Sequence, residues 1–123
     1  VRPDPFFNRH GYDVICEVPI TFTQAALGTE IEVPTIDGKT VTLKIPRGTQ
    51  SGQIFRLRNL GIPHLRGYGR GDQLVVTVIE VPSKLTRKQE ELLREFAKTE
   101  EVHVTPRRKS FFEKLKEYFS TEK

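Results

Sequence analysis

Residues 30–46 read EIEVPTIDGKTVTLKIP, and this stretch predicts a β-hairpin. A period of two, which places one face of each strand in the interior, runs on both sides of its centre. The alternating apolar residues are Ile31, Val33, Val41, Leu43 and Ile45. Between them, Asp37-Gly38 suits a tight turn, because both residues adopt positive φ angles at low cost. We therefore expect two paired strands, Glu30–Pro34 and Thr40–Pro46.

The same alternation appears upstream of the hairpin. Every second residue from Tyr12 to Ile20 is apolar, which predicts a half-buried strand. Thr21 to Gln24 then have the spacing of a helix capping box, in which the first and fourth side chains bond each other's backbone. Gly28 is suited to end this helix. A connector of about one to two helical turns fits here.

Two further strands are predicted downstream. Ile54–Arg58 alternates apolar and basic residues, and Gln73–Val81 is a long, valine-rich run that Pro82 ends. A glycine-rich loop over residues 61–71 separates them. Five strands within about eighty residues indicate a mainly β fold, a small antiparallel β-sandwich or barrel-like domain.

The pattern becomes helical after Pro82, and we expect one or two C-terminal α-helices. Thr86-Arg87-Lys88-Gln89 has capping-box form, and helical spacing continues through Thr99. Residues 101–109 contain Pro106 and few apolar residues, which predicts a linker. Ser110-Phe111-Phe112-Glu113 then repeats the cap pattern and predicts a second short helix.

Composition sets further bounds. The 123 residues, with a net charge of +4, fit one domain with an appendage, and a start at Val1 without any methionine leads us to expect a fragment. No apolar run approaches the ~18 residues of a membrane span, so we expect a soluble chain without a membrane partner. Cys16, the only cysteine, precludes an internal disulfide and favours the reducing cytoplasm. Its place in an alternating strand assigns it to the core.

No catalytic or metal-binding constellation is evident. Gly38-Lys39-Thr40 matches the end of a phosphate-binding loop, but Val33 stands where that loop requires glycine. His10, His64 and His103 lie in three separate segments, so we expect no metal site. The carboxylates lie near turns or at outward strand positions, where solvated groups are the default. We expect no enzyme activity, no catalytic residue and no cofactor in this chain.

Residues 38–71 are basic, with seven Lys and Arg and no acidic residue. Two interpretations stay open: a solvated sheet face balanced by acids elsewhere, and a binding patch for anions or acidic peptides. Single-stranded nucleic acid is the weaker candidate as a partner. Its binding favours aromatic residues among the basic ones, and this stretch offers only Phe55, which faces inward, and Tyr68.

The sequence contains AALGTEIEVPTIDG at residues 25–38, IPRGTQSG at 45–52, FRLRNLGIP at 55–63, Arg66-Gly67, and GDQL at 71–74. In order and spacing, these stretches closely resemble the second carboxy-terminal β-domain of DnaJ-type co-chaperones. The opening VRPDPFFNRHG resembles the connection from the first such domain, with Asp4 where the family commonly has histidine. The resemblance covers nearly all of residues 1–119.

The resemblance implies a co-chaperone of protein folding and the stress response, which binds unfolded polypeptide clients and delivers them to a DnaK-type ATP-driven chaperone. It divides the chain into a connection from a preceding domain (1–11), a client-binding β-domain (12–82), a dimerisation helix (83–100), a linker (101–109) and a short C-terminal helix with its tail (110–123). The family's His-Pro-Asp motif and zinc-binding cysteine repeats are absent from this sequence. We therefore expect this chain alone not to stimulate the ATPase.

The resemblance also implies that the first C-terminal helix holds two protomers together as a homodimer. The second helix carries an apolar stripe that needs a partner surface, because a short exposed tail would not bear so many aromatic residues. The predicted interface residues are Leu85, Leu92, Leu93, Phe96, Phe111, Phe112, Leu115 and Phe119. The alternative is that the first helix only covers an edge of the β-domain.

Four apolar residues fall outside the core pattern of the predicted strands: Ile36, Ile62, Leu65 and Tyr68. Exposed apolar groups often mark contact sites, so these are the predicted client-binding residues. Two alternatives to a client-binding function stay open. One is a nucleic-acid-binding β-domain that uses residues 38–71, and the other is a purely structural assembly module.

Overall fold

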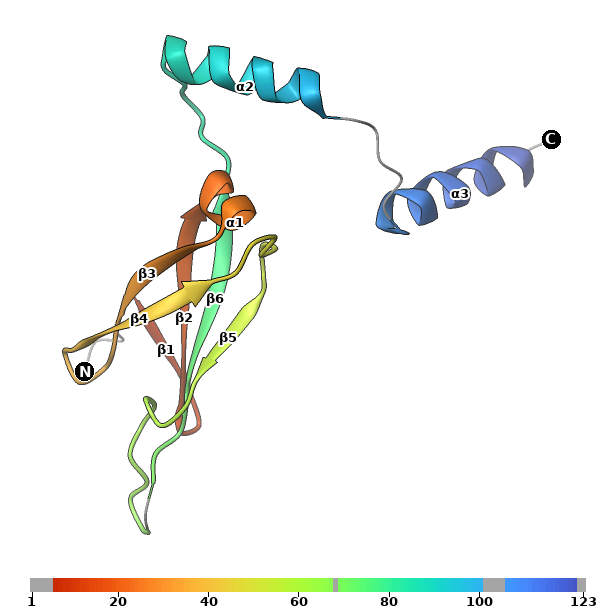
Figure 1. Ribbon diagram of the computed structural model, residues 1–123. Helices are drawn as coiled ribbons and strands as arrows, with labels where there is room; N and C mark the ends of the chain where they lie inside the picture. The colour runs from red at the N-terminus through yellow and green to blue at the C-terminus, as the bar shows by residue number, and fades with distance from the viewer. Residues whose placement is uncertain (1–5, 68, 101–105, 122–123) are drawn as a thin grey trace. The chain divides into compact units, whose positions relative to one another are not determined.

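Four strands form the larger of two sheets in the computed structural model, which describes residues 6–67, 69–100 and 106–121. Their order is β1 (Phe7–His10), β2 (Asp13–Thr21), β6 (Gln73–Glu80) and β5 (Ile54–Leu57) (Figure 1). The pairs β1–β2 and β5–β6 are antiparallel, whereas β2 and β6 run parallel. The larger sheet is therefore mixed.

The prediction of a mainly β fold with a short connector helix and C-terminal helices is confirmed. The parallel β2–β6 pairing corrects the expectation of purely antiparallel strands, and the strands of the described residues form open sheets rather than a barrel. Parallel neighbours need a long crossover, which here contains a helix, a hairpin and β5. Side chains alternate along both kinds of strand, so the sequence pattern did not reveal this direction.

The smaller sheet is the predicted hairpin of β3 (Thr29–Pro34) and β4 (Thr40–Ile45). Its loop is Ile36 to Gly38, one residue longer than the expected two-residue turn. The Gly38 N–H donates to the Thr35 carbonyl over 3.1 Å, and Gly38 has a φ of +80°. Asp37 is not among the residues with positive φ. This arrangement matches a type I turn followed by a left-handed glycine.

β1 is a strand that the sequence analysis missed, because residues 1–11 were assigned to a connection. It pairs with β2 from Phe7 opposite Cys16 to His10 opposite Asp13. The chain reverses at Gly11, whose φ is +67°. A four-residue strand with a single aromatic residue gives almost no periodic signal.

Two helices begin at the predicted capping boxes. In α1 (Phe22–Leu27) the Thr21 and Gln24 side chains each bond the other's backbone, and Thr86 and Gln89 do the same in α2 (Arg87–Thr99). Both capping predictions are confirmed.

The third helix, α3 (Pro106–Thr121), begins four residues earlier than expected. Ser110 therefore lies inside the helix, and its predicted capping role is wrong. Proline is well suited to the first helical position, where a backbone N–H has no partner in the helix. The helices α2 and α3 belong to a compact unit of residues 83–123, separate from the β unit of residues 1–82.

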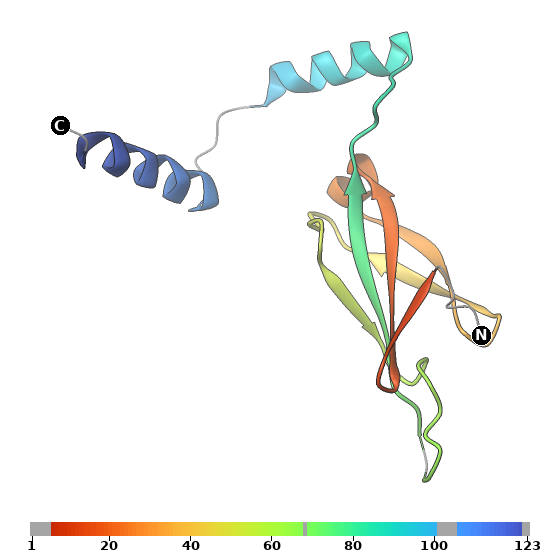
Figure 2. The ribbon, with the colours of Figure 1, turned by 180° about the vertical axis from the view of Figure 1, so that it is seen from behind.

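The β3–β4 hairpin lies across one face of the larger sheet, as Figures 1 and 2 show from opposite sides. The core of the β unit lies between the two sheets. Its buried residues are Cys16, Ile20, Ala25, Val33, Leu43, Ile45 and Val75. The core position predicted for Cys16 is confirmed, with 1% of the residue exposed. Two polar residues of β6, Gln73 and Thr77, are buried as well.

Candidate functional site

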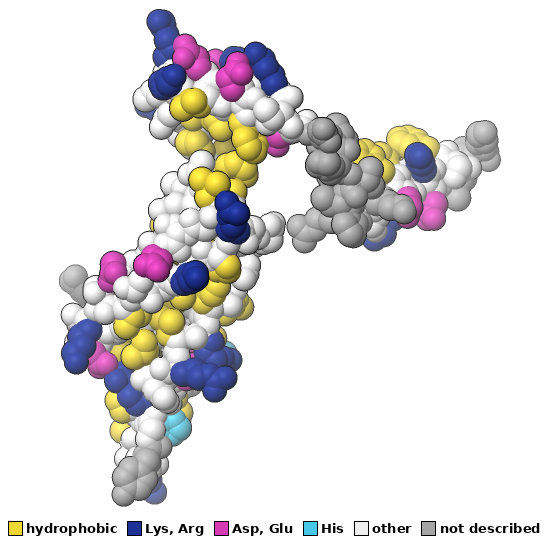
Figure 3. All heavy atoms as spheres, in the orientation of Figure 1, with side chains coloured by type: hydrophobic (Ala, Val, Ile, Leu, Met, Phe, Trp, Pro, Cys, Tyr) yellow, Lys and Arg dark blue, Asp and Glu magenta, His cyan; other side chains and the backbone are white. Residues whose placement is uncertain are grey.

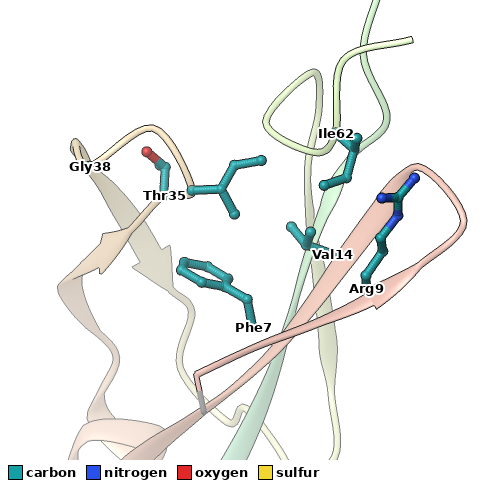
Figure 4. A pocket seen from close by; sticks show the side chains of 7 residues that line it. Phe7, Arg9, Val14, Thr35, Gly38 and Ile62 are labelled. Carbon is teal, nitrogen blue, oxygen red and sulfur yellow. The ribbon is translucent and has the colours of Figure 1, made fainter. Parts of the chain in front are cut away.

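A surface pocket of about 450 Å³ lies where β1 and β2 meet the hairpin loop and the segment after β5. Phe7, Val14 and Ile62 approach it from three of these segments (Figure 4). The residues that line it are Phe7, Arg9, Val14, Thr35, Ile36, Gly38 and Ile62. Four of these side chains are apolar and Arg9 is the only charged one, so the pocket suits an apolar group.

Two of the four predicted client-binding residues line this pocket. Ile36 and Ile62 are both half-buried, although the sequence separates them by a strand, a turn and a further strand. Leu65 does not line the pocket and is 88% exposed. Tyr68 lies outside the described residues. The structure thus brings the two isoleucines together and leaves Leu65 apart.

Phe7 and Arg9 are pocket residues that the sequence analysis missed. They occupy alternate positions of β1 and therefore share one face of that strand. The Arg9 Nε donates to the Gly11 carbonyl over 2.8 Å, which orients the guanidinium. The sequence offers only a weak signal for them, which is the turn residue Gly11 directly before the predicted strand that begins at Tyr12.

Ile62 is held in the pocket wall by close backbone packing. Its N–H donates to the Tyr12 carbonyl over 2.7 Å, and its carbonyl accepts from the Gly71 N–H over 3.0 Å. A Cβ atom at Gly71 would lie 1.9 Å from the Tyr12 carbonyl oxygen, and one at Gly61 would lie 2.5 Å from it. Only glycine permits this approach, so these two glycines set the position of Ile62.

Ile36 is held by the geometry of the hairpin loop. The backbone N–H of Thr35 donates to the Lys39 carbonyl over 2.8 Å, and the Thr35 hydroxyl lies 3.2 Å from the same oxygen. Because Thr35 is only 5% exposed, its bonds to Lys39 hold the hairpin loop against the β unit. The bonds fix the base of the three-residue loop that carries Ile36.

An ion pair joins the hairpin loop to the glycine-rich loop. The Arg70 guanidinium binds the Asp37 carboxylate with two contacts, Nη1 to Oδ2 at 2.8 Å and Nη2 to Oδ1 at 3.2 Å. The hydrogen bond from Arg70 lowers the pKa of Asp37, because it favours the ionised carboxylate. The loop side of the pocket is therefore held by a charge-assisted fork.

A second ion pair lies beside the same loop. The Arg56 Nη1 is 2.5 Å from Asp72 Oδ2, and the Asn59 N–H donates to Asp72 Oδ1 over 3.0 Å. The Asn59 backbone bond, followed by the Arg56 bond, lowers the pKa of Asp72. Two arginines of the basic 38–71 stretch are thus paired with acidic residues at its two ends. Arg70 pairs with Asp37, which directly precedes the stretch, and Arg56 pairs with Asp72, which directly follows it.

A smaller hollow of about 400 Å³ lies between the end of α1 and the end of β4. Arg47 reaches across it, with its Nε donating to the Leu27 carbonyl over 3.3 Å. Glu30 and Lys44 also line the hollow. No residue predicted to bind a client lies there.

The predicted interface residues are exposed within their own unit. Leu85 precedes α2, and Leu92, Leu93 and Phe96 lie on α2 with between 41% and 55% of each residue exposed. Figure 3 shows the hydrophobic side chains of α2 on one side of the helix and charged side chains on the other. On α3 the exposed residues are Phe111, Phe112, Leu115, Tyr118 and Phe119. Each helix thus carries exposed apolar surface.

Within residues 6–67, 69–100 and 106–121, no three His, Cys, Asp or Glu side chains gather closely enough to hold a metal ion. Burial raises the pKa of the Cys16 thiol, which leaves it protonated and unreactive at neutral pH. None of the described helices is both long and apolar enough to cross a membrane.

Two family models match the chain. The DnaJ C terminal domain model matches residues 1–82, and the model of the Chaperone protein DnaJ C-terminal region matches residues 88–121. The boundary between the matches lies close to the boundary between the two compact units.

Several curated relatives are similar along nearly the whole chain. Chaperone protein DnaJ of Ruminiclostridium cellulolyticum is 59% identical over 119 residues, which is 97% of this chain and 31% of the relative. The protein of the same name from Acetivibrio thermocellus is 59% identical over 117 residues, 95% of this chain and 30% of the relative. That of Listeria monocytogenes serotype 4a is 56% identical over 119 residues, 97% of this chain and 31% of the relative. The chain thus spans about a third of these relatives, and it belongs to the DnaJ C terminal domain family.

Proposed function

We propose that the chain is the client-binding part of a DnaJ-type co-chaperone in protein folding, and that its pocket receives an apolar side chain of an unfolded polypeptide. The observation that carries this proposal is the convergence of Phe7, Val14, Ile36 and Ile62 on one open pocket. Burial of apolar surface contributes about 25 cal/mol per Å², so an unfolded chain with exposed apolar groups gains by occupying it. A folded protein, whose apolar groups are already buried, does not.

Such a site is expected to bind weakly and with little sequence specificity. Precisely placed polar groups normally fix the orientation of a ligand, and here the lining offers mainly aliphatic and aromatic side chains. Thr35 is already bonded to Lys39 through its hydroxyl. The pocket therefore selects an occupant by apolar character more than by sequence, which suits a protein with many different clients.

Delivery of the client to a DnaK-type ATP-driven chaperone is the role we propose for the whole protein, on the basis of its family. We propose a binding function without catalysis or cofactor. We propose the reducing cytoplasm as its compartment, because Cys16 is the only cysteine of the sequence and is a free thiol.

We further propose that the C-terminal helices hold a homodimer. An amphipathic helix has to bury its apolar face, and a two-fold axis lets the same stripe meet its copy. Leu92, Leu93 and Phe96 supply that stripe on α2, and the aromatic residues of α3 extend the apolar surface available to the interface. Two pockets on one dimer make the second client contact intramolecular, which lengthens the lifetime of the complex.

The test of the client site is the binding of a fluorescent, permanently unfolded protein. The double variant Ile36→Ser/Ile62→Ser removes two apolar groups from the pocket, and we expect at least about tenfold weaker binding. Val81→Ser is the matched control, since Val81 is apolar and 86% exposed but lies outside the pocket. Circular dichroism confirms that each variant is folded. Unchanged binding by the double variant, or an equal loss in the control, would refute this site.

A further inference from the structure

We infer that the ion pair between Arg70 and Asp37 is a positioning element that sets the distance between two walls of the client pocket. The inference rests on the proposed function of the pocket and deepens it. It assigns a role to two charged residues that do not line the pocket themselves.

The two walls belong to different parts of the fold. Ile36 lies in the loop of the β3–β4 sheet, whereas Ile62 lies in the segment between β5 and β6 of the larger sheet. No strand pairing joins the two sheets within the described chain. Near the base of the hairpin, Gln73 Nε2 donates to the Pro34 carbonyl over 3.0 Å. The Thr35–Lys39 bonds hold the loop within the hairpin, but they do not connect it to the segment that carries Ile62.

Arg70 is anchored on the Ile62 side of the pocket. Its Nε and Nη2 donate to the Gly61 carbonyl over 3.0 and 2.7 Å, and Gly61 directly precedes Ile62. The Arg70 side chain is 26% exposed. The guanidinium is planar and rigid, so the Gly61 bonds also fix the direction in which its remaining N–H groups point.

Those N–H groups hold the loop on the Ile36 side. Asp37 lies between Ile36 and Gly38, which both line the pocket. Its two carboxylate oxygens accept hydrogen bonds from Nη1 and Nη2 of Arg70. A bidentate fork restricts both distance and orientation. The Arg70 side chain thus connects the immediate sequence neighbours of two pocket residues, Ile36 and Ile62.

The ion pair is better suited to this geometric role than to holding the fold together. Exposed ion pairs contribute little to stability, and 43% of the Asp37 side chain is exposed. The core between the sheets does not include either residue. Removal of the pair is therefore expected to change the pocket while the β unit stays folded. If the pair mainly stabilised the fold, its removal would instead lower the stability of the β unit more than it changed the pocket.

The experiment measures the affinity of the 123-residue chain for an extended fluorescent peptide rich in Leu and Ile, together with the methyl NMR signals of Ile36 and Ile62. Asp37→Asn removes the charge and keeps the size of the side chain. We expect about two- to fivefold weaker binding, shifted Ile36 and Ile62 methyl signals, and only a small decrease in the thermal midpoint, because the pair is largely exposed. Asp37→Glu keeps a carboxylate within reach of Arg70, and we expect it to restore most of the affinity.

Arg56→Gln is the matched control, because it breaks the ion pair with Asp72, which does not join the two walls. We expect it to bind the peptide like the unaltered chain. Equal affinity of Asp37→Asn and the unaltered chain overturns the positioning role alone. A loss in Arg56→Gln as large as that in Asp37→Asn overturns it too, as does failure of Asp37→Glu to recover affinity. If the unaltered chain binds no peptide, the proposed function itself fails, and the positioning role falls with it.

Discussion

The side-chain amide of Gln73 on β6 donates a hydrogen bond to the carbonyl of Pro34 on β3, so that a single buried side chain connects the two sheets. Gln73 is 0% exposed, and its Nε2 also lies 3.4 Å from the Cys16 sulfur. The other amide atom, Oε1, has no hydrogen-bond partner among the described protein atoms. An unpaired buried oxygen is costly, so the bond to Pro34 and the packing of the side chain have to outweigh it.

Replacement of Gln73 by alanine is expected to destabilise the β unit by about 2–4 kcal/mol, because it leaves a cavity and an unpaired Pro34 carbonyl. Urea unfolding followed by circular dichroism measures the change. Gln50→Ala, at an exposed position, is the control and should change stability by less than about 0.5 kcal/mol. Similar losses in the two variants would show that the Gln73 side chain has no special part in joining the sheets.

Gly71→Ala is expected to destabilise the β unit by about 3 kcal/mol and to weaken client binding, since the new Cβ would overlap the Tyr12 carbonyl that also accepts from Ile62. Gly38→Ala provides a comparison, because its Cβ meets open space and only the positive φ of +80° opposes it. That variant should lose about 1 kcal/mol. The prediction fails if Gly71→Ala is as stable as Gly38→Ala in thermal unfolding.

The sequence predicted most of the β unit because local signals agree there with the final packing. Alternation located β2, β3, β4, β5 and β6, and capping boxes located the starts of α1 and α2. The parallel direction of β6 next to β2 was missed, since it depends on the path of the intervening chain rather than on either strand. The start of α3 is not predicted, because proline is as typical of a linker as of the first helical turn, where Pro106 lies.

The sequence singles out only two of the seven residues that line the pocket, for a similar reason. Ile36 and Ile62 stand out as apolar residues outside the core pattern, and the neighbouring sequence alone is enough to identify them. Phe7 and Arg9 become pocket residues only because β1 folds back onto β2 beside the hairpin loop. The Arg70–Asp37 pair joins positions 33 residues apart, a separation at which sequence spacing carries no information about contact.

Acid should weaken the β unit through Asp72. The pKa of Asp72 is lower in the folded state than its usual value of about 3.9, so the folded form binds the proton less readily than the unfolded form does. The ionised carboxylate therefore stabilises the fold above about pH 4, and this contribution is lost as the pH falls through the folded-state pKa. Asp72→Asn should be less stable at neutral pH and less sensitive to pH between about 2 and 4.

Thermal unfolding across that pH range measures the effect of Asp72. Gln50→Ala, which alters an exposed side chain that does not titrate, is the control and should keep the pH dependence of the unaltered chain. An Asp72→Asn variant that declines as steeply in acid as the unaltered chain would assign the acid sensitivity to other groups.

Phe96→Ala is expected to weaken the proposed dimer, because an aromatic residue at the centre of an interface typically contributes about 2 kcal/mol or more, roughly thirtyfold in dissociation constant. Light scattering across a dilution series measures the change in mass. Lys88→Ala on the same helix serves as the polar control.

Removal of residues 83–123 should leave a folded monomer, since the core of the β unit contains no residue from that segment. A monomeric unaltered chain, or a dimeric truncation, contradicts this prediction.

The parallel pairing of β2 with β6 has a consequence for the order of folding. At the start of this pairing, the Asp72 N–H donates to the Asp13 carboxylate over 2.7 Å, and the two residues are 59 positions apart in the sequence. By contrast, β3 and β4 pair across a three-residue loop. Contacts between distant positions form late, because the entropy of closing a long loop is lost before the contacts are gained. The hairpin is thus expected to form within microseconds, and β6 to enter the larger sheet in the slow, rate-limiting step. Until then, one edge of β2 is open to pairing with another chain.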